Sequence, residues 1–449
     1  MAQGIKAPTT EDLMSMWNAS GLKQKIIFTL AMIAIWRFGV QMPLYGINAD
    51  VFATQVLGNG GNNLIGFLDL FTGGALGTVS ILALGIGPFI TSSIIVQLVS
   101  VVIPALEKLQ KEEGEAGRRK LSQYTRIFTV VLAVFQSFIF MLYLHHLPGA
   151  INPDVNTIAF YVSSIITLTA GAVLVMWLSE LITENGIGNG GSLIIFCGIL
   201  SGIPIYAQRT AQIIHSNTRM QLGVLLLLAI FFLAMILIVI MQEAVRKVII
   251  VNPKRQIGNK VYGGMNSFIP FKLNPGGVMP IIFAIAILLF PSTIIALVGN
   301  ADIKSMAVKN FVLSLNHWLS PSGITYYLIY VGLIIALTFF YASIMPNMQP
   351  KDIADNLKKY GSSIPGIKPG RPTAEALDKI LTKTTFIGAM GLGIVALIPS
   401  FASYATHIET LQGIGATSLI IMVGVALDLI NQVKTHLLAR NYESFLKDM

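Results

Sequence analysis

Long apolar segments alternate with shorter polar ones along this chain, and ten of the apolar segments are each about as long as a bilayer is thick. They lie near residues 23–43, 78–103, 122–144, 157–178, 191–212, 221–242, 277–299, 322–345, 382–399 and 414–433. The hydrocarbon core of a bilayer is about 30 Å thick and needs roughly 20 apolar residues in a helix. Only helices or closed barrels satisfy their backbone groups there. The pattern therefore predicts an all-α membrane protein with ten transmembrane helices.

Composition and charge agree with this class. Hydrophobic residues make up 54% of the chain and charged residues only 11%, which is typical of a multi-spanning protein and not of a soluble enzyme. Most Lys and Arg residues fall in alternate loops, whereas the loops between them hold only Arg209, Arg219, Lys304 and Lys309. Positive loops face the cytoplasm, so both termini are expected there. The first apolar segment lacks a small-residue cleavage site and is expected to be retained.

The order of the segments indicates an internal repeat. Five segments lie in residues 1–214 and five in residues 215–449, and an odd number per half gives the halves opposite orientations. In inverted repeats, Gly- or Pro-interrupted segments at matching positions of the halves indicate the working site. Here Gly73, Gly74 and Gly77 interrupt one such segment and Pro275 to Pro280 the other. We expect these two helices to face each other across a pathway.

The stretch 62–75 is apolar but too short to cross a bilayer, and it carries Asp69. One interpretation is an amphipathic cap on the outer surface. The other is a short helix that dips into a funnel and is hinged on Gly73 and Gly74, since glycine tolerates the backbone angles of a sharp hinge. The sequence alone leaves both open.

Loops 243–272 and 346–381 are longer than ordinary connections, and such loops are often functional. Basic clusters beside a membrane either set topology and contact anionic lipid, or dock an acidic partner or RNA phosphate. The candidate docking residues are Arg246, Lys247, Lys254, Arg255, Lys351, Lys358, Lys368 and Arg371.

Residue types needed for catalysis do not occur in useful patterns. No cluster has metal-ligand spacing, and the run GIGNGG (186–191) joins two apolar segments, whereas a nucleotide loop joins a strand to a helix. We therefore expect no cofactor, no metal and no catalytic residue.

Arg37 lies about 21 Å from the cytoplasmic end of its helix, close enough to the far interface for its side chain to snorkel there. Cys197 is the only cysteine, so no intramolecular disulfide can form.

Seven motifs together carry a resemblance to a known family. They are FTGGAL (71–76), LGIGPFITSSIIVQL (84–98), GEAGRRKLSQYTR (114–126), MWLSELITENGIGNGGSLIIF (176–196), GGVMPIIFA (276–284), ADNLKKYGSSIPGIKPG (354–370) and GATSLII (415–421). In this order they closely resemble the bacterial SecY family, the channel subunits of the Sec protein translocon. The resemblance extends from the first apolar segment to residues 441–447.

This resemblance implies an hourglass pore between two inverted five-helix halves, closed by a plug and opening sideways through a lateral gate. It implies a plug at 62–75 that includes Asn62, Leu68, Asp69, Phe71, Gly73 and Gly74. The gate residues it implies are Thr91, Gln97, Gln136 and Asn274, which are expected to form hydrogen bonds between helices. Ordinary packing between helices is the alternative for these residues.

The family's constriction ring is implied at Ile86, Ile90, Ile195, Ile282 and Ile421. Ile86 and Ile90 are four residues apart and share one helix face, as two ring residues from one helix must. An apolar ring can dewet when it closes and so stop ion flow. Without the resemblance, each isoleucine would be assigned to the core or to a lipid-facing surface.

The chain departs from the family pattern at three positions. Lys368 replaces the arginine of the usual Gly-Ile-Arg-Pro-Gly run, with Arg371 three residues later, and lysine lacks the planar fork of arginine. Asn185 stands where a basic residue is usual, and Gly191 replaces an aliphatic residue. Neither Asn185 nor Gly191 is expected to touch the pore.

The resemblance implies a non-enzymatic channel that passes unfolded polypeptides across the bacterial plasma membrane and releases apolar segments into it. The implied partners are SecE-like and SecG-like small subunits, a SecA-like ATPase motor, the ribosome, signal sequences with their unfolded preproteins, and anionic lipids. A small-solute secondary transporter with inverted repeats is the alternative, which a mid-membrane coupling carboxylate would favour. An insertase scaffold without a pore is a third hypothesis. Co-purification of a small single-span subunit would favour the channel.

Overall fold

The computed structural model describes residues 21–58, 63–111, 114–155, 157–216, 220–252, 254–257, 260–263, 266–298, 314, 318, 323–344, 349–406 and 416–447. The chain forms two compact units, which are described separately. Unit 1 comprises residues 1–207, 289–320 and 425–449, and unit 2 comprises residues 208–288 and 321–424. The symmetry expected between residues 1–214 and 215–449 stays a prediction.

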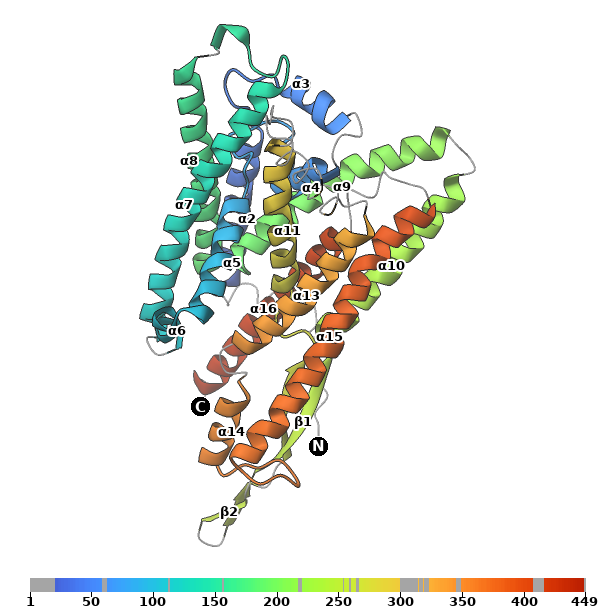
Figure 1. The fold of residues 1–449 in the computed structure, drawn as a ribbon. Helices are drawn as coiled ribbons and strands as arrows, with labels where there is room; N and C mark the ends of the chain where they lie inside the picture. Colours follow the sequence, from blue (N-terminus) through green and yellow to red (C-terminus); the bar gives the residue numbers. More distant parts are fainter. Residues whose placement is uncertain are drawn as a thin grey trace. The chain divides into compact units, whose positions relative to one another are not determined.

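Unit 1 is built from helices and short turns. Its elements are α2 (Leu22–Val40), α3 (Ala49–Phe52), the π-helical turn η1 (Ala53–Gly58), α4 (Asn63–Thr72), α5 (Gly87–Val102), α6 (Pro104–Lys111), α7 (Gly114–His146), η2 (Pro153–Val155), α8 (Ile158–Asn185) and most of α9 (Gly190–Ser216). The helix α7 lies along α8 and α5, and α2 lies along α8 (Figure 1).

Unit 2 combines helices with two hairpins. Its elements are α10 (Met220–Glu243), β1 (Val245–Val251), β2 (Lys254–Ile257), β3 (Lys260–Gly263), β4 (Asn266–Lys272), the first part of α11 (Met279–Val298), α13 (Ile324–Ile344), α14 (Pro350–Lys359), α15 (Arg371–Thr406) and the first part of α16 (Ala416–Lys447). Both α10 and α13 pack along α15 (Figure 1).

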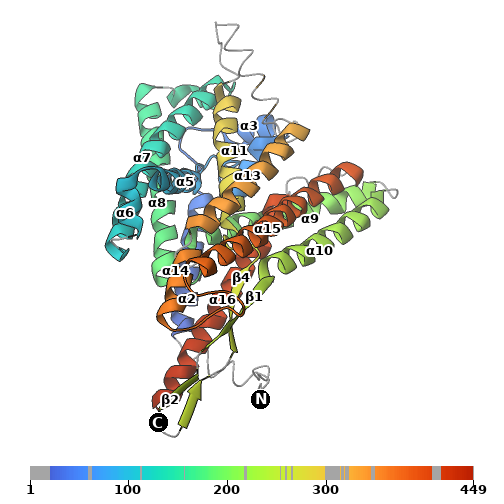
Figure 2. The ribbon, with the colours of Figure 1, turned by 60° about the horizontal axis from the view of Figure 1, so that its bottom comes forward.

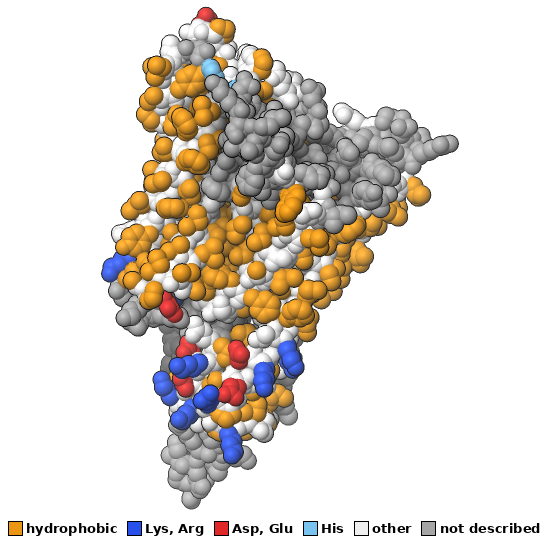
Figure 3. Space-filling model, in the orientation of Figure 1, with side chains coloured by type: hydrophobic (Ala, Val, Ile, Leu, Met, Phe, Trp, Pro, Cys, Tyr) orange, Lys and Arg blue, Asp and Glu red, His pale blue; other side chains and the backbone are white. Residues whose placement is uncertain are grey.

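A helix lies at each of the ten predicted spans. In the part of the chain that the structure describes, seven helices are long and apolar enough to cross a membrane, namely α7, α8, α9, α10, α13, α15 and α16. Exposed apolar side chains are spread along the surfaces of the long helices. Charged side chains instead gather around α14 and the start of α15 in unit 2 (Figure 3). This separation is typical of helices whose sides face lipid.

The second predicted span, 78–103, is wrong at its start. The helix α5 begins only at Gly87, with Pro88 in its first turn. A proline is tolerated there, because the N–H groups of the first turn have no acceptor within the helix. The preceding residues form turns, and Pro43 and Ser80 pair as an isolated antiparallel bridge. Backbone N–H and C=O groups of this irregular segment thereby form hydrogen bonds with the residues that follow α2.

The loop expected at 243–272 forms two antiparallel hairpins, which the sequence did not lead us to expect. β1 pairs with β4 from Val245 opposite Lys272 to Val251 opposite Asn266, and β2 pairs with β3. The second long loop is also ordered, because α14 occupies its centre and α15 begins at Arg371. Val251 and Ser363 exchange backbone hydrogen bonds of 2.9 and 3.1 Å, so the two loops form one structure (Figure 2).

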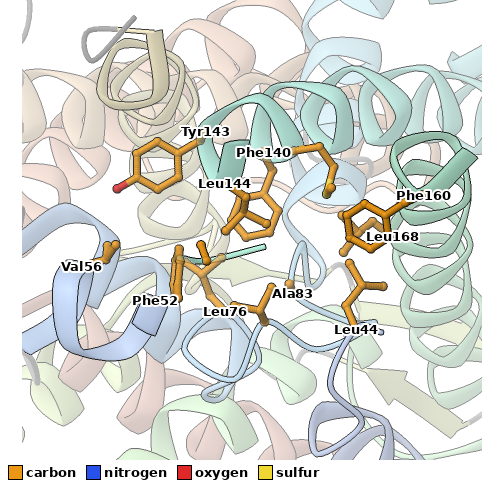
Figure 4. Close-up of a cluster of buried hydrophobic side chains, with 13 residues drawn as sticks. Leu44, Phe52, Val56, Leu76, Ala83, Phe140, Tyr143, Leu144, Phe160 and Leu168 are labelled. Carbon is orange, nitrogen blue, oxygen red and sulfur yellow. The ribbon is translucent and has the colours of Figure 1, made fainter. Parts of the chain in front are cut away.

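Each unit has its own core at these connections. In unit 1, Phe140, Tyr143 and Leu144 of α7 close over Phe52, whose ring meets that of Phe140 edge to face at 6.0 Å (Figure 4). In unit 2, Val248 and Phe271 of the first hairpin pack with Ile364, Leu377 and Leu381. Burial of a large apolar side chain contributes about 1.5 to 3 kcal/mol, so both clusters fix their loops against the helices.

Candidate functional site

The short helix α4 forms the centre of the candidate site. Its ten residues give it a length of about 15 Å, too short to cross a bilayer. It ends at Gly73 and Gly74, whose φ angles of 71° and 88° lie in the left-handed region that favours glycine. A short helix followed by two left-handed glycines is therefore present, whereas its role as a plug or as an outer cap stays a prediction, and Asn62 lies outside the described residues. Leu68 packs against the core of unit 1 and Phe71 is half-buried.

The carboxylate of Asp69 joins α4 to the chain beyond the hinge. Its Oδ1 accepts a hydrogen bond of 2.7 Å from the N–H of Gly77, and its backbone carbonyl accepts one of 2.8 Å from the N–H of Gly74. Burial raises the pKa of Asp69 above the ordinary carboxyl value, whereas the N–H groups of Gly77 and Leu76 and the charge of Arg37 lower it. The net shift is upward, so burial is the larger effect.

Arg37 of α2 points toward the same hinge. Its Nη1 donates hydrogen bonds to the carbonyl of Gly73 and, at 3.3 Å, to Oγ of Ser201 on α9. The guanidinium group thus has acceptors within the unit, and the expectation that it snorkels to the interface stays a prediction. Ser201 in turn donates to the carbonyl of Gly198 at 2.7 Å.

Close packing holds the end of α4 between α2 and α9. A methyl group added at Gly198 would lie 3.1 Å from the carbonyl oxygens of Leu70 and Phe71. One added at Gly73 would lie 2.7 Å from the Trp36 ring. Only glycine permits this approach, because the atoms opposite Gly198 belong to the backbone and cannot rotate away.

The predicted ring residues lie in different units, and each is described within its own. In unit 1, Ile86 and Ile195 are buried and Ile90 is half-buried, while Ile282 and Ile421 are buried in unit 2. The N–H of Ile90 donates to the carbonyl of Ile86 at 3.1 Å, as expected for residues one helical turn apart. The ring itself stays a prediction.

Gly191 lies beside Ile86, one of the predicted ring residues, while the expectation that Gly191 does not touch the pore stays a prediction. A methyl group added there would lie 3.4 Å from Cδ1 of Ile86. The family's aliphatic residue at this position would therefore press against Ile86, and glycine leaves the isoleucine more room.

The predicted gate residues make mostly local hydrogen bonds. Thr91 donates to the carbonyl of Gly87 on its own helix, and its expected bond to another helix stays a prediction. Gln97 donates to Ser93, one turn earlier on α5, at 3.0 Å. Gln136 is half-buried on α7.

Asn274 is the gate residue that does connect two elements. Its Nδ2 donates to the carbonyl of Gly277 at 2.5 Å and to Oε1 of Gln242 on α10 at 3.5 Å. Asn274 is only 1% exposed, and neither its Oδ1 nor Nε2 of Gln242 has a partner among the described residues. Unpartnered buried amide groups are costly, so this contact between α10 and the turn before α11 is weakly satisfied.

The run GIGNGG does not form a cradle for phosphate. The N–H of Ile187 donates to Oγ1 of Thr29 at 3.1 Å and that of Gly188 to Oε1 of Gln432 at 2.8 Å. The N–H of Gly190 donates to Oγ1 of Thr183 at 2.9 Å. Because side chains already use these donors, the loop serves to join α8 and α9 to α2 and α16 within unit 1.

The candidate docking residues surround the first hairpin and α14. Arg246, Lys247, Lys351, Lys358 and Lys368 are exposed, and Nζ of Lys247 lies 4.9 Å from the centre of the Phe268 ring. Arg371 is also exposed, with its Nε bonded to Glu375 one turn later at 3.1 Å. Lys254 and Arg255 lie on β2, and their side chains are outside the described part of the structure.

Acidic residues also lie on this surface. Asp352 and Asp355 on α14 and Glu375 on α15 are exposed. Acidic and basic side chains are interspersed in this part of unit 2 (Figure 3). The surface is therefore of mixed charge, which favours a partner with a defined pattern of charges over a uniform polyanion.

Sequence reasoning missed the residues that hold α4. Trp36, Gly198 and Ser201 become significant only through contacts between helices that are distant in sequence. A weak signal existed, because Gly198 and Ser201 are both small residues about one turn apart on α9, and small residues let helix backbones approach closely. Among the described residues, no three His, Cys, Asp or Glu side chains come together to hold a metal.

Relatives of this chain share one name. Protein translocase subunit SecY of Synechococcus elongatus is 43% identical over 453 residues, which cover all of both chains. Protein translocase subunit SecY of Escherichia coli K12 is 39% identical over 430 residues, which cover 95% of this chain and 94% of that protein.

Solved structures show the same fold at low sequence identity. A protein-conducting channel superposes with a TM-score of 0.65 at 17% identity, and coverage is 92% of each chain. A SecY protein whose plug domain stabilises the closed state of the translocation channel and maintains a membrane seal gives a TM-score of 0.62 at 16% identity and the same coverage. Sec61 in the canine ribosome-channel complex gives 0.60 at 16% identity, again with 92% of each chain.

A family model supplies the remaining comparison. The SecY model matches residues 80–430, which is well over half of the chain. With two relatives near 40% identity over nearly their whole length, this match shows that the chain is a multi-pass membrane protein that belongs to the SecY family.

Proposed function

We propose that this chain is the channel subunit of a protein translocase. It passes unfolded polypeptides across a membrane and releases apolar segments into the lipid. Its relatives are named protein translocase subunit SecY, and structures of the same fold are protein-conducting channels. The alternative of a small-solute transporter is not favoured by any of these relatives.

The observation that carries this proposal is the docking of α4. This helix is too short to cross a bilayer, and hydrogen bonds and close contacts around the two glycines hold its end against α2 and α9. A helix held in this way can leave its place when the hinge angles change, because few residues must be rearranged. We propose that α4 is the plug of the closed channel, in the role that the plug domain has in a related SecY protein.

The other parts of the pathway follow the same proposal. The ring consists of Ile86, Ile90, Ile195, Ile282 and Ile421, which together seal an hourglass pore around the polypeptide. The lateral gate includes Thr91, Gln97, Gln136 and Asn274. Asn274 supports a gate role best, because its weakly satisfied contact with Gln242 is inexpensive to exchange for contacts with a signal sequence.

The surface around the first hairpin and α14 is the proposed docking site. A ribosome and a SecA-like motor would bind there, and chain movement would come from them, since the proposal assigns no catalytic step to this chain. The ribosome-bound relative Sec61 supports such a partner. SecE-like and SecG-like subunits complete the proposed channel, which lies in a bacterial plasma membrane with both termini in the cytoplasm and with anionic lipids around it.

Deletion of residues 63–72 tests the plug. Channels reconstituted with the deletion should leak ions at rest and still translocate preprotein, because the seal is lost and the pathway is not. Co-purification of a small single-span subunit is the control for intact assembly. Unchanged resting conductance in an assembled channel would show that α4 is an external cap. Transport of a small solute by the chain alone would contradict the channel itself.

A further inference from the structure

We propose that Arg37 is a latch that holds α4 in its docked position, and that Ser201 positions the guanidinium group for this task. The inference rests on the proposed function of α4 as the plug. It assigns a role to a charged side chain that lies in the first predicted span and that neither the proposed ring nor the proposed gate uses.

The first argument is the place of the bond. Gly73 directly follows the last residue of α4, and the carbonyl groups at the end of a helix have no partner within it. The helix dipole also makes this end negative. A guanidinium group that donates to the carbonyl of Gly73 satisfies such a group and neutralises the dipole with one contact.

The second argument is that Arg37 is itself held. Ser201 donates its hydroxyl proton to the carbonyl of Gly198, so its oxygen lone pairs are free to accept from Nη1 of Arg37. The residue that positions the guanidinium group is therefore anchored on α9, one turn from the glycine that touches the end of α4. Three helices, α2, α4 and α9, meet at a single cationic group.

The third argument is that the contact can be reversed. The bond to Gly73 is made to a backbone carbonyl, not to a carboxylate, and water can replace that carbonyl when α4 leaves. Charge-assisted hydrogen bonds are stronger than neutral ones, yet one such bond shifts an equilibrium by only about tenfold to a hundredfold. A contact of this strength keeps the resting channel closed without making opening prohibitive.

The test follows α4 directly with a label at Gly66. A side chain placed there would meet no atom within 4 Å, so Gly66→Cys carries a spin label without disturbing the docked helix. Cys197→Ser removes the only natural cysteine. Label mobility and resting ion conductance are then measured on the assembled channel for Arg37→Met, Arg37→Lys and Ser201→Ala. The matched control is Arg126→Gln, which removes an exposed arginine that pairs with Glu180 in the same unit.

We expect Arg37→Met to raise both the mobile fraction of the label and the resting conductance about tenfold, since it removes a charge-assisted bond. Arg37→Lys should give a smaller rise, because lysine keeps the charge but not the planar fork. Ser201→Ala should raise both by about threefold, and Arg126→Gln should change neither. If Arg37→Met does not assemble, the milder Ser201→Ala still tests the latch through its smaller rise.

The deletion of residues 63–72 separates this inference from the proposed function. The latch is overturned, and the plug is left intact, if the deletion causes a leak while the labelled Arg37→Met and Ser201→Ala channels show an immobile label and normal conductance. A channel that does not leak after the deletion overturns the plug. In the deletion background, Arg37→Met should add no further leak, and an added leak would show that Arg37 acts elsewhere.

Discussion

Asp69 of α4 accepts a hydrogen bond of 2.7 Å from the backbone N–H of Gly77, four residues beyond the first glycine of the hinge. This bond spans Gly73 and Gly74, so α4 cannot rotate about the hinge without breaking it. The Asp69 carboxylate thus bonds to the chain beyond the two glycines, while Arg37 donates to the carbonyl of the first of them, Gly73. Both interactions oppose undocking of the helix.

Two substitutions at Asp69 should have opposite effects. Asp69→Asn keeps an oxygen acceptor for Gly77 and removes the cost of burying a charge, so α4 should dock at least as firmly. Asp69→Ala leaves the buried N–H of Gly77 without its partner, which costs about 1 to 3 kcal/mol. Resting conductance should fall or stay unchanged in the first variant and rise about tenfold in the second. Equal leak from both would contradict a role for the hydrogen bond.

The same carboxylate should make docking depend on pH. Burial raises its pKa in the docked state above 3.8, so the docked state binds the proton more strongly than the undocked state. Docking is therefore favoured at low pH and weakens as the pH rises from 3.8 through the raised pKa. The mobility of a label at Gly66 should increase over that interval, and Asp69→Asn should abolish the change.

Gly198→Ala should loosen α4 by steric pressure. The added methyl group would lie 3.1 Å from two backbone carbonyl oxygens and 3.2 Å from the N of Gly73, and none of these atoms can give way without moving α4. We expect increased resting conductance with nearly unchanged thermal stability of the channel. Gly332→Ala on α13 is the control, since a methyl group there meets nothing within 4 Å. A silent Gly198→Ala would mean that α4 is not confined by α9.

The lengths of the apolar segments predicted the helices well, because the thickness of a bilayer sets the length that a spanning helix needs. A helix was found at each predicted span, and Gly73 and Gly74 adopted left-handed backbone angles after α4, since two consecutive glycines after a short apolar run favour such a turn. The late start of α5 shows the limit of this reasoning. Residues 78–86 are apolar enough for a span, yet pairing with the segment after α2 decides their conformation.

Features that depend on contacts between distant segments could not be predicted. The hairpin of β1 and β4 forms because Val248 and Phe271 find a core on α15, and nothing local to 243–272 shows that core. In the same way, position along α2 did not show that the carbonyl of Gly73, just after α4, and a hydroxyl on α9 hold Arg37. Tertiary acceptors outweighed the local pattern in both cases.

Asn274 and Gln242 should behave as a coupled pair. Asn274→Leu leaves the buried amide of Gln242 without a partner and should destabilise the protein by about 1 to 3 kcal/mol. Asn274→Leu combined with Gln242→Leu removes both polar groups and should be close to neutral. Thermal unfolding of the four proteins of this cycle measures the coupling. Additive losses would show that the 3.5 Å contact is not significant.

Substitution of the ring residues should separate a seal from an ordinary core. Serine at Ile86, Ile195 or Ile282 should hydrate the constriction and increase ion leak. Ile195 and Ile282 have matched controls, since Ile194 is as buried as Ile195 and Ile281 is buried beside Ile282. Serine at a control position should only destabilise, by about 1 to 4 kcal/mol, as large-to-small changes in cores do. Leak that is equal in the two sets would assign all these isoleucines to the core.

Charge reversal on the docking surface should weaken partner binding. Arg246→Glu and Lys368→Glu change exposed side chains that no acidic residue pairs in the described structure, whereas Arg371 is already bonded to Glu375 and is less suitable. We expect lower affinity for the motor or the ribosome and a weaker dependence on salt, because exposed pairs are screened over about 8 Å at physiological ionic strength. Lys368→Arg should bind normally or slightly better. Lys23→Glu, an exposed change at the start of α2 in unit 1 and outside the candidate set, is the control. Binding that is unaltered in correctly inserted Arg246→Glu and Lys368→Glu channels would return both loops to a topological role.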